Sequence, residues 1–168
     1  MENSLIESLL EVCKILNTHS VEYLIVGGTA VAFHGYDRLS HDSSGKLMEK
    51  DDLDFWYNPT YDNYFRLLDA LEDLGLNVTE FRDEISPNPK KSFFRMDQEN
   101  FQMDFLPEIP GLSKFLASFT NGSVYTIRDV EMRYLNYDDL ILSKSALSRE
   151  KDIEDIDQLQ LRKDNPDT

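Results

Sequence analysis

The feature that most constrains the fold of this chain is a short apolar run that two glycines stop. Residues 23–26 (Tyr-Leu-Ile-Val) are strand formers, Gly27 and Gly28 follow at once, and residues 29–34 (Thr-Ala-Val-Ala-Phe-His) are typical of the start of a helix. The pattern predicts a strand, a glycine turn and a helix. Glycines let the backbone approach a ligand, amides at a helix start attract phosphate oxygens, and Thr29 adds a hydroxyl. A phosphate cradle is one interpretation, and a tight structural turn is the other.

A pair of acids follows on the next predicted strand. Residues 52–57 read Asp-Leu-Asp-Phe-Trp-Tyr, and because side chains alternate along a strand, Asp52 and Asp54 project to the same face, roughly 7 Å apart. Two carboxylates at that separation suit Mg²⁺, which takes one or two protein carboxylates and completes its octahedron with water and substrate phosphates. An ordinary solvated strand face would explain the same two residues.

A third acid, Asp104, lies in the predicted strand 101–106. Phe101, Met103 and Phe105 alternate onto one face, which leaves Asp104 on the other. Taken singly it reads as a polar-face residue. A glycine turn, a paired Asp on the next strand and a lone Asp on a later strand together indicate metal-dependent phosphoryl or nucleotidyl transfer, which needs acids for metal and proton transfer and a cradle for phosphate.

The remaining chain alternates helical and strand patterns, which predicts one α/β domain over residues 1–168 with a small mixed sheet flanked by helices. Residues 37–51 are polar and predict an inserted loop, and residues 162–168 predict a polar tail. Thr60 is expected to begin a helix and Gly75 to follow its end. The other expected helices are 4–18, 113–119, 137–147 and 150–161, and the other expected strands are 77–81, 92–96 and 124–127.

The charge balance excludes one class of partner. The chain has 17 Lys plus Arg against 32 Asp plus Glu, a net charge of −15, whereas proteins that coat nucleic acid need clustered basic residues. We therefore expect no extended nucleic-acid groove. A hydrophobic fraction of 40% is enough to build a core.

The sequence carries no apolar run of the ~20 residues that a membrane helix needs and no signal-peptide pattern, so we expect no membrane association and a cytoplasmic protein. The single cysteine, Cys13, lies among apolar residues at helical spacing and is interpreted as a core residue.

At these motifs the sequence resembles the minimal nucleotidyltransferases of the DNA polymerase beta superfamily, whose signature is an apolar strand, Gly-Gly or Gly-Ser, a helix, Asp-x-Asp and a later third Asp. The closer resemblance is to the AbiEii-like toxin–antitoxin branch, which has Val-Gly-Gly-Thr-Ala-Val, His-Gly, an Arg, and later a helical Lys and Arg-x-Lys-Asp-x-x-Asp. The matching residues, within a likeness over residues 20–160, are Val26 to Val31, His34-Gly35, Arg38, Lys144 and residues 149–155.

The resemblance implies roles for these residues. Asp52, Asp54 and Asp104 would be catalytic and would bind Mg²⁺, and Lys144 would be a catalytic cation that steadies the triphosphate. The residues implied in nucleotide binding are Gly27, Gly28, Thr29, Arg38 and Lys151.

Simpler interpretations stay open. Lys144 reads equally as an exposed helix lysine, and residues 149–155 as the first turn of a helix with ion pairs at spacings of three and four. His34 is typical of a helix-packing residue. In the branch the Asp pair follows the Arg closely, whereas here the 37–51 segment intervenes, so Ser40 is only a candidate for the usual Thr.

The sequence thus predicts a Mg²⁺-dependent nucleotidyltransferase that moves a nucleoside monophosphate from a nucleoside triphosphate to an acceptor hydroxyl. The acceptor is open: a protein, a small molecule, including an aminoglycoside-like one, or an RNA end. The alternative is a catalytically silent module of the same fold that binds a partner protein, as an antitoxin-like component would, because an acidic surface suits a basic partner.

Overall fold

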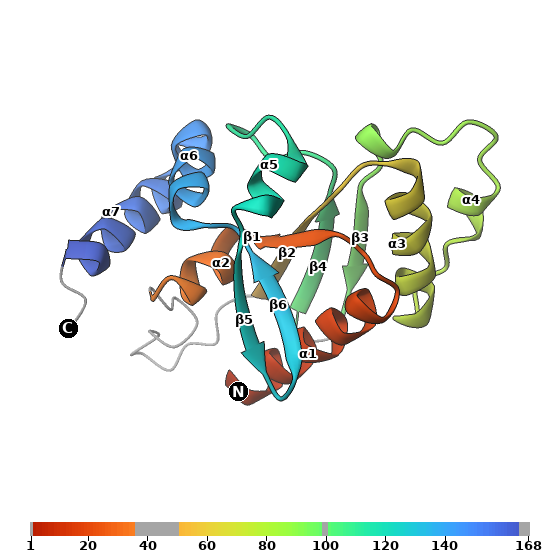
Figure 1. The fold of residues 1–168 in the computed structure, drawn as a ribbon, viewed down its shortest axis with the longest axis horizontal. Coiled ribbons are helices and arrows are strands. Elements are labelled where there is room, and N and C mark those ends of the chain that lie inside the picture. Colours follow the sequence, from red (N-terminus) through yellow and green to blue (C-terminus); the bar gives the residue numbers. More distant parts are fainter. Residues whose placement is uncertain (1, 36–50, 99–100, 165–168) are drawn as a thin grey trace.

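The computed structural model describes residues 2–35, 51–98 and 101–164, which form one mixed sheet with helices around it (Figure 1). The strands of this part are β1 (Tyr23–Val26), β2 (Asp51–Tyr57), β3 (Phe94–Asp97), β4 (Phe101–Leu106), β5 (Ser123–Ile127) and β6 (Val130–Tyr134). The helices are α1 (Glu2–Thr18), α2 (Gly27–Phe33), α3 (Tyr61–Asp73), α4 (Thr79–Arg82), α5 (Phe115–Thr120), α6 (Tyr137–Leu147) and α7 (Glu150–Asp164), with a 3-10 turn, η1 (Pro89–Lys91).

The strands form a single sheet in the order β3-β4-β2-β1-β6-β5. At its centre β1 runs antiparallel to β2, β2 runs parallel to β4, and β1 runs parallel to β6. Both edges are antiparallel pairs, β3 with β4 and β5 with β6. The prediction of an α/β chain with a mixed sheet is therefore confirmed.

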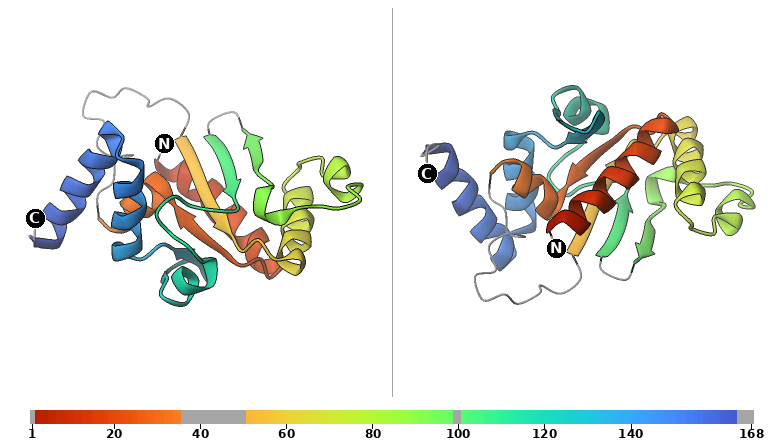
Figure 2. Two further views of the ribbon diagram at one scale, coloured as in Figure 1. Left: turned by 90° about the horizontal axis from the view of Figure 1, so that it is seen from above. Right: turned by 90° about the horizontal axis from the view of Figure 1, so that it is seen from below.

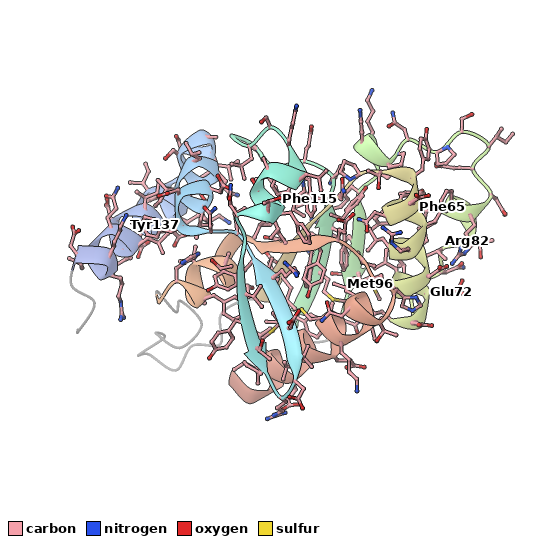
Figure 3. The ribbon with its side chains drawn as sticks, in the orientation of Figure 1. Phe65, Glu72, Arg82, Met96, Phe115 and Tyr137 are labelled. Atoms are coloured by element: carbon pink, nitrogen blue, oxygen red, sulfur yellow. The ribbon has the colours of Figure 1, made fainter. Side chains whose placement is uncertain are left out.

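Each face of the sheet has its own core, because side chains alternate along every strand. On one face α1 lies across the strands, as the right view of Figure 2 shows from below, and Leu53 and Phe55 pack there together with residues of α1 and α3. On the other face Val26 and Trp56 pack with residues of α2, α5 and α6. The Trp56 ring meets Phe115 of α5 edge to face with centroids 5.2 Å apart, and Phe115 is labelled above the sheet in Figure 3.

The helix α3 begins after Thr60 and ends before Gly75, as the sequence predicted. The Thr60 side chain accepts a hydrogen bond from the Asn63 amide, as a helix N-cap does, and Gly75 has a φ of +103° just past the last turn. Cys13 of α1 is fully buried, which confirms its interpretation as a core residue. None of the helices in the described ranges is long and apolar enough to cross a bilayer.

The strand predicted over residues 77–81 is wrong, because Thr79–Arg82 form the short helix α4. The Asn77 side chain accepts a hydrogen bond from the Thr79 amide and so starts a helical turn. The turn still brings Phe81 against Phe94, with ring centroids 4.6 Å apart. Burial of the apolar residues is preserved, and the local side-chain hydrogen bond decides the backbone conformation.

One strand and the end of one helix also differ from the prediction. The strand β6 was not predicted, although residues 130–134 alternate apolar and polar side chains; it forms a hairpin with β5 through Arg128 and Asp129, both at positive φ. The helix α7 continues to Asp164, so the first residues of the predicted tail are helical. Of the predicted loop at 37–51, Asp51 begins β2 and the rest lies outside the described residues.

Candidate active site

The three predicted acids come together on one face of the sheet. Register pairs Asp54 of β2 with Val26 of β1 on one side and with Asp104 of β4 on the other. Asp52 lies two residues before Asp54 on the same strand face and is exposed. We call Asp52, Asp54 and Asp104 the acid row. The parallel pairing of β2 with β4 is what places residues fifty positions apart in the sequence side by side in the sheet.

The glycine turn lies directly against the acid row. Gly27 has a φ of +66°, and a Cβ atom at this position would lie 2.6 Å from Asp54 Oδ2. A side chain at residue 27 would therefore be both strained and in collision with the carboxylate. Gly28 is partly exposed, whereas Thr29 is buried at 5% exposure. The predicted glycine turn is thus the start of α2 itself, with Gly27 and Gly28 as the first two helical residues, and it brings its backbone to Asp54.

The acid row carries more negative charge than its surroundings balance. Burial, reinforced by the nearby carboxylates of Asp104 and Asp52, raises the pKa of Asp54 to about 6, and the charges of Lys144 and Lys151 oppose this rise. A carboxyl held among other carboxylates attracts a cation, and strongly shifted acids in an accessible position are typical of functional sites.

Asp104 has a basic partner that the sequence analysis did not identify. Arg95 of β3 stands directly opposite Asp104 in the antiparallel pair. Its Nε donates to Asp104 Oδ1 at 2.8 Å and its Nη2 to Oδ2 at 3.1 Å. The signal was in the alternation of β3: Phe94 and Met96 are buried, which leaves Arg95 on the face of the acids. What the alternation did not give was the register between β3 and β4.

Lys144 is buried and paired. It is 4% exposed, and its Nζ lies 3.2 Å from Asp152 Oδ1 and 3.0 Å from Asp155 Oδ2, both of α7. Arg149 joins them, because its Nε donates to Asp152 Oδ2 at 2.6 Å. We call these four residues the buried ion-pair cluster. The interpretation of Lys144 as an exposed helix lysine is wrong, and of the ion pairs expected at the start of α7 the structure gives the pair at spacing three, Arg149 with Asp152.

The other implied residues lie as follows. Lys151 is exposed at the start of α7, where its charge acts on Asp54. The helix α6 contacts α2 as well as α7, which sets this junction beside the glycine turn. His34 bonds through Nε2 to the Leu135 carbonyl oxygen at 2.8 Å, as a packing residue would. Arg38 and Ser40 lie outside the described residues.

The donor set fits a hard divalent cation in part. Asp52 and Asp54 present carboxylate oxygens on one strand face, and the pKa of Asp54 is raised first by burial and then by the charges of Asp104 and Asp52. Both oxygens of Asp104, by contrast, already accept hydrogen bonds from Arg95. Among the residues that the structure describes, no three metal-ligating side chains form a ready cation site. Of the three predicted ligands, Asp52 and Asp54 are the two whose oxygens accept no hydrogen bond from an arginine among the described contacts.

Two solved structures share the fold of this chain. A lincosamide antibiotic adenylyltransferase, LnuA, with lincomycin bound superposes with a TM-score of 0.57 over 95% of this chain and 96% of its own, at 18% identity. The antibiotic-resistance factor ANT(2'')-Ia superposes with a TM-score of 0.56 over 96% of this chain and 85% of its own, at 14% identity.

At these identities the likeness concerns the fold alone. No protein-family description and no curated protein matches the sequence. The resemblance to nucleotidyltransferases is thus confirmed at the level of the fold. The finer resemblance to the AbiEii-like branch has no support from the two neighbours and stays a prediction.

Proposed function

We propose that this protein is a Mg²⁺-dependent nucleotidyltransferase that moves a nucleoside monophosphate from a nucleoside triphosphate to a hydroxyl of a small molecule. The observation that carries the proposal is the contact of the glycine turn with the acid row, since a Cβ at Gly27 would lie 2.6 Å from Asp54 Oδ2. A phosphate held at that turn would lie beside two carboxylates that suit a divalent cation.

Asp52 and Asp54 would hold the metal ion, which when bound offsets charge on the phosphate oxygens. The backbone of Gly27 and Gly28 would approach the phosphates. Asp104 would accept the proton of the acceptor hydroxyl as the new bond to the α-phosphorus forms and the bond to the departing pyrophosphate breaks.

The junction of α6 and α7 would supply positive charge. Lys151 is exposed, and the Arg149 side chain is about half exposed at 51%. Both act electrostatically on Asp54. They are therefore better placed than the buried Lys144 to contact a triphosphate. Lys144 would contribute its charge from within the cluster that fixes α7 against α6.

A small hydroxyl-bearing acceptor, such as an antibiotic, is consistent with the fold of this protein and with its net negative charge. The two neighbours are a lincosamide adenylyltransferase and an antibiotic-resistance factor. The net charge of −15 opposes a long nucleic acid and attracts a cationic acceptor. An amino-bearing, polyhydroxylated acceptor combines both requirements.

The test is a transfer assay with Mg²⁺, each labelled nucleoside triphosphate in turn, and a panel of lincosamides, aminoglycosides and other polyhydroxylated amines. We expect a labelled product and release of pyrophosphate with at least one acceptor. Asp54→Asn is the matched inactive control. Undiminished transfer by that variant would falsify the assignment of the site.

A silent, protein-binding module of the same fold is the second candidate, because the Arg95 guanidinium engages both oxygens of Asp104. Thermal unfolding separates the two functions. A nucleotidyltransferase is stabilised by a nucleoside triphosphate only when Mg²⁺ is present, whereas a silent module shows no shift with either.

A further inference from the structure

Arg95 engages Asp104 in a way that distinguishes this acid from the other two. The guanidinium lies in a two-point contact with the carboxylate, at 2.8 and 3.1 Å. It reaches Asp104 from β3, whereas Asp54 stands on the opposite side, on β2. Asp104 therefore lies between a cation and an anion, while Asp52 and Asp54 have no comparable hydrogen-bonded cation among the described contacts.

The two-point contact restricts what else Asp104 can bind. A carboxylate offers about four lone-pair positions, and the fork of an arginine takes one on each oxygen. One position on each oxygen remains. It can accept a hydrogen bond from a hydroxyl, but chelation of a metal ion by both oxygens would displace the guanidinium. A positive charge in contact with Asp104 also repels a metal ion from it.

Further contacts hold the guanidinium in place. Arg95 Cζ lies 5.3 Å from the centroid of the Phe93 ring, within the range of a cation–π contact. Two residues along β3, on the same face, the negative charge of Asp97 also acts on Arg95. The Arg95 side chain is 51% exposed and that of Asp104 13%, so the pair is anchored at its acid end and reachable at its base end.

We propose that Arg95 is a positioning residue that keeps Asp104 out of the metal site and presents it to the acceptor hydroxyl. Asp52 and Asp54 alone then hold the divalent cation. This inference deepens the proposed function and rests on it for the role of the acceptor. Its claim about the metal site, however, can be tested without any transfer reaction.

The experiment measures Mn²⁺ affinity by calorimetric titration in the wild type and five variants. Arg95→Met removes the guanidinium, and we expect Mn²⁺ to bind roughly tenfold more tightly because a nearby positive charge is lost and Asp104 is released. Arg95→Lys keeps the charge and should stay within about threefold of the wild type. Arg95→Met combined with Asp104→Asn should lose the gain, because the released carboxylate is then absent.

The matched control is Arg133→Met. Arg133 is also a strand arginine over a phenylalanine, with Cζ 4.9 Å from the Phe119 ring, but it lies on β6, two strands from β2. Its loss should leave Mn²⁺ affinity unchanged. An equal gain in this control would show a general charge effect and would overturn the assignment to Arg95.

Two other results also decide the proposal. Unchanged or weaker Mn²⁺ binding by a folded Arg95→Met variant overturns it, as does loss of Mn²⁺ binding in the single variant Asp104→Asn, because Asp104 would then be a metal ligand already. Binding by Arg95→Met but not by the wild type supports the role of Arg95 while contradicting the proposed function, so the two failures are distinguishable.

Discussion

The acid row and the buried ion-pair cluster contain the same kinds of residue in opposite balance. In the cluster, Lys144 and Arg149 face Asp152 and Asp155, two positive charges against two negative ones. Both acids and Lys144 are buried. The acid row sets three carboxylates against one directly bonded cation, Arg95, at an accessible place on the sheet.

The comparison separates a balanced structural charge cluster from the acid row, where we propose that a cation binds. Charges taken out of water persist only where they are paired, so a balanced buried set holds helices together. Like charges placed close together, as in the acid row, repel one another and lower stability. Burial first, and the carboxylates of Asp104 and Asp52 second, raise the pKa of Asp54 to about 6.

The largest expected effect on stability comes from removing one member of the buried ion-pair cluster. Lys144→Met leaves the carboxylates of Asp152 and Asp155 buried without their shared ammonium group. We expect the free energy of unfolding to fall by about 3–5 kcal/mol, measured by urea denaturation. Neutralising both acids in the same chain, with Asp152→Asn and Asp155→Asn, should recover part of the loss. A single variant within about 1 kcal/mol of the wild type would contradict a buried cluster.

Neutralising Asp54 in the acid row should instead raise the free energy of unfolding at neutral pH. Asp54 has a folded-state pKa of about 6 against an ordinary value of 3.8. Protonation of Asp54 therefore favours the folded state. This contribution to the free energy of unfolding is fully present below pH 4 and is lost as the pH rises through about 6, by up to about 3 kcal/mol. Asp54→Asn should remove this fall, so that the variant is more stable than the wild type at pH 7 but inactive.

Unfolding curves measured between pH 4 and 7 check the prediction for Asp54. Asp157→Asn makes the same charge change at an exposed position of α7 and serves as the control. If Asp54→Asn keeps the pH slope of the wild type, the acid row is not the source of that slope.

A pair of glycine substitutions separates backbone strain from damage to the site. Gly27 and Gly75 both have positive φ, +66° and +103°, so alanine at either should cost about 1–2 kcal/mol. At Gly75 no atom lies within 4 Å of the added methyl, whereas at Gly27 it meets Asp54 Oδ2. We expect only Gly27→Ala to weaken Mg²⁺–nucleotide binding, by at least about tenfold. Equal binding by the two variants would show that the contact with Asp54 has no role.

The smallest effect is expected at the exposed edge of the α6–α7 junction. Lys151→Ala removes a cation near Asp54 without touching a buried group. The melting temperature should not change, and the dissociation constant for a nucleoside triphosphate should rise a few-fold at low salt and less at high salt. Lys163→Ala, at the far end of α7 over the Tyr137 ring, is the control. An identical effect in the control would point to net charge rather than to the site.

Local pattern was sufficient to predict much of this molecule. The alternation of each strand placed Asp52, Asp54 and Asp104 on the face opposite the apolar residues that fill the core. Capping residues marked both ends of the helix α3. Prediction failed where one hydrogen bond or turn outweighed the pattern. The Asn77 side chain makes a helix of a segment predicted as a strand, and a turn without glycine, at Arg128 and Asp129, carries the hairpin that was missed.

The sequence predicted which residues make up the candidate site but not which side chains contact one another. The role of Arg95 depends on the register of β3 with β4, which the alternation of a single strand does not contain. The burial of Lys144 depends on how α7 folds back on α6, so the same lysine fitted an exposed position equally well.

By itself, the sequence determined which residues share a face and that a glycine turn precedes the acids, because a strand repeats every two residues and a turn needs a residue tolerant of positive φ. Only the tertiary structure decided which charges balance one another. It set Arg95 on Asp104, closed Lys144 between two carboxylates and left Asp54 with its pKa raised. The reason is physical: a charge interaction depends on the distance between atoms and on exclusion of water, and neither exists until the strands and helices are packed.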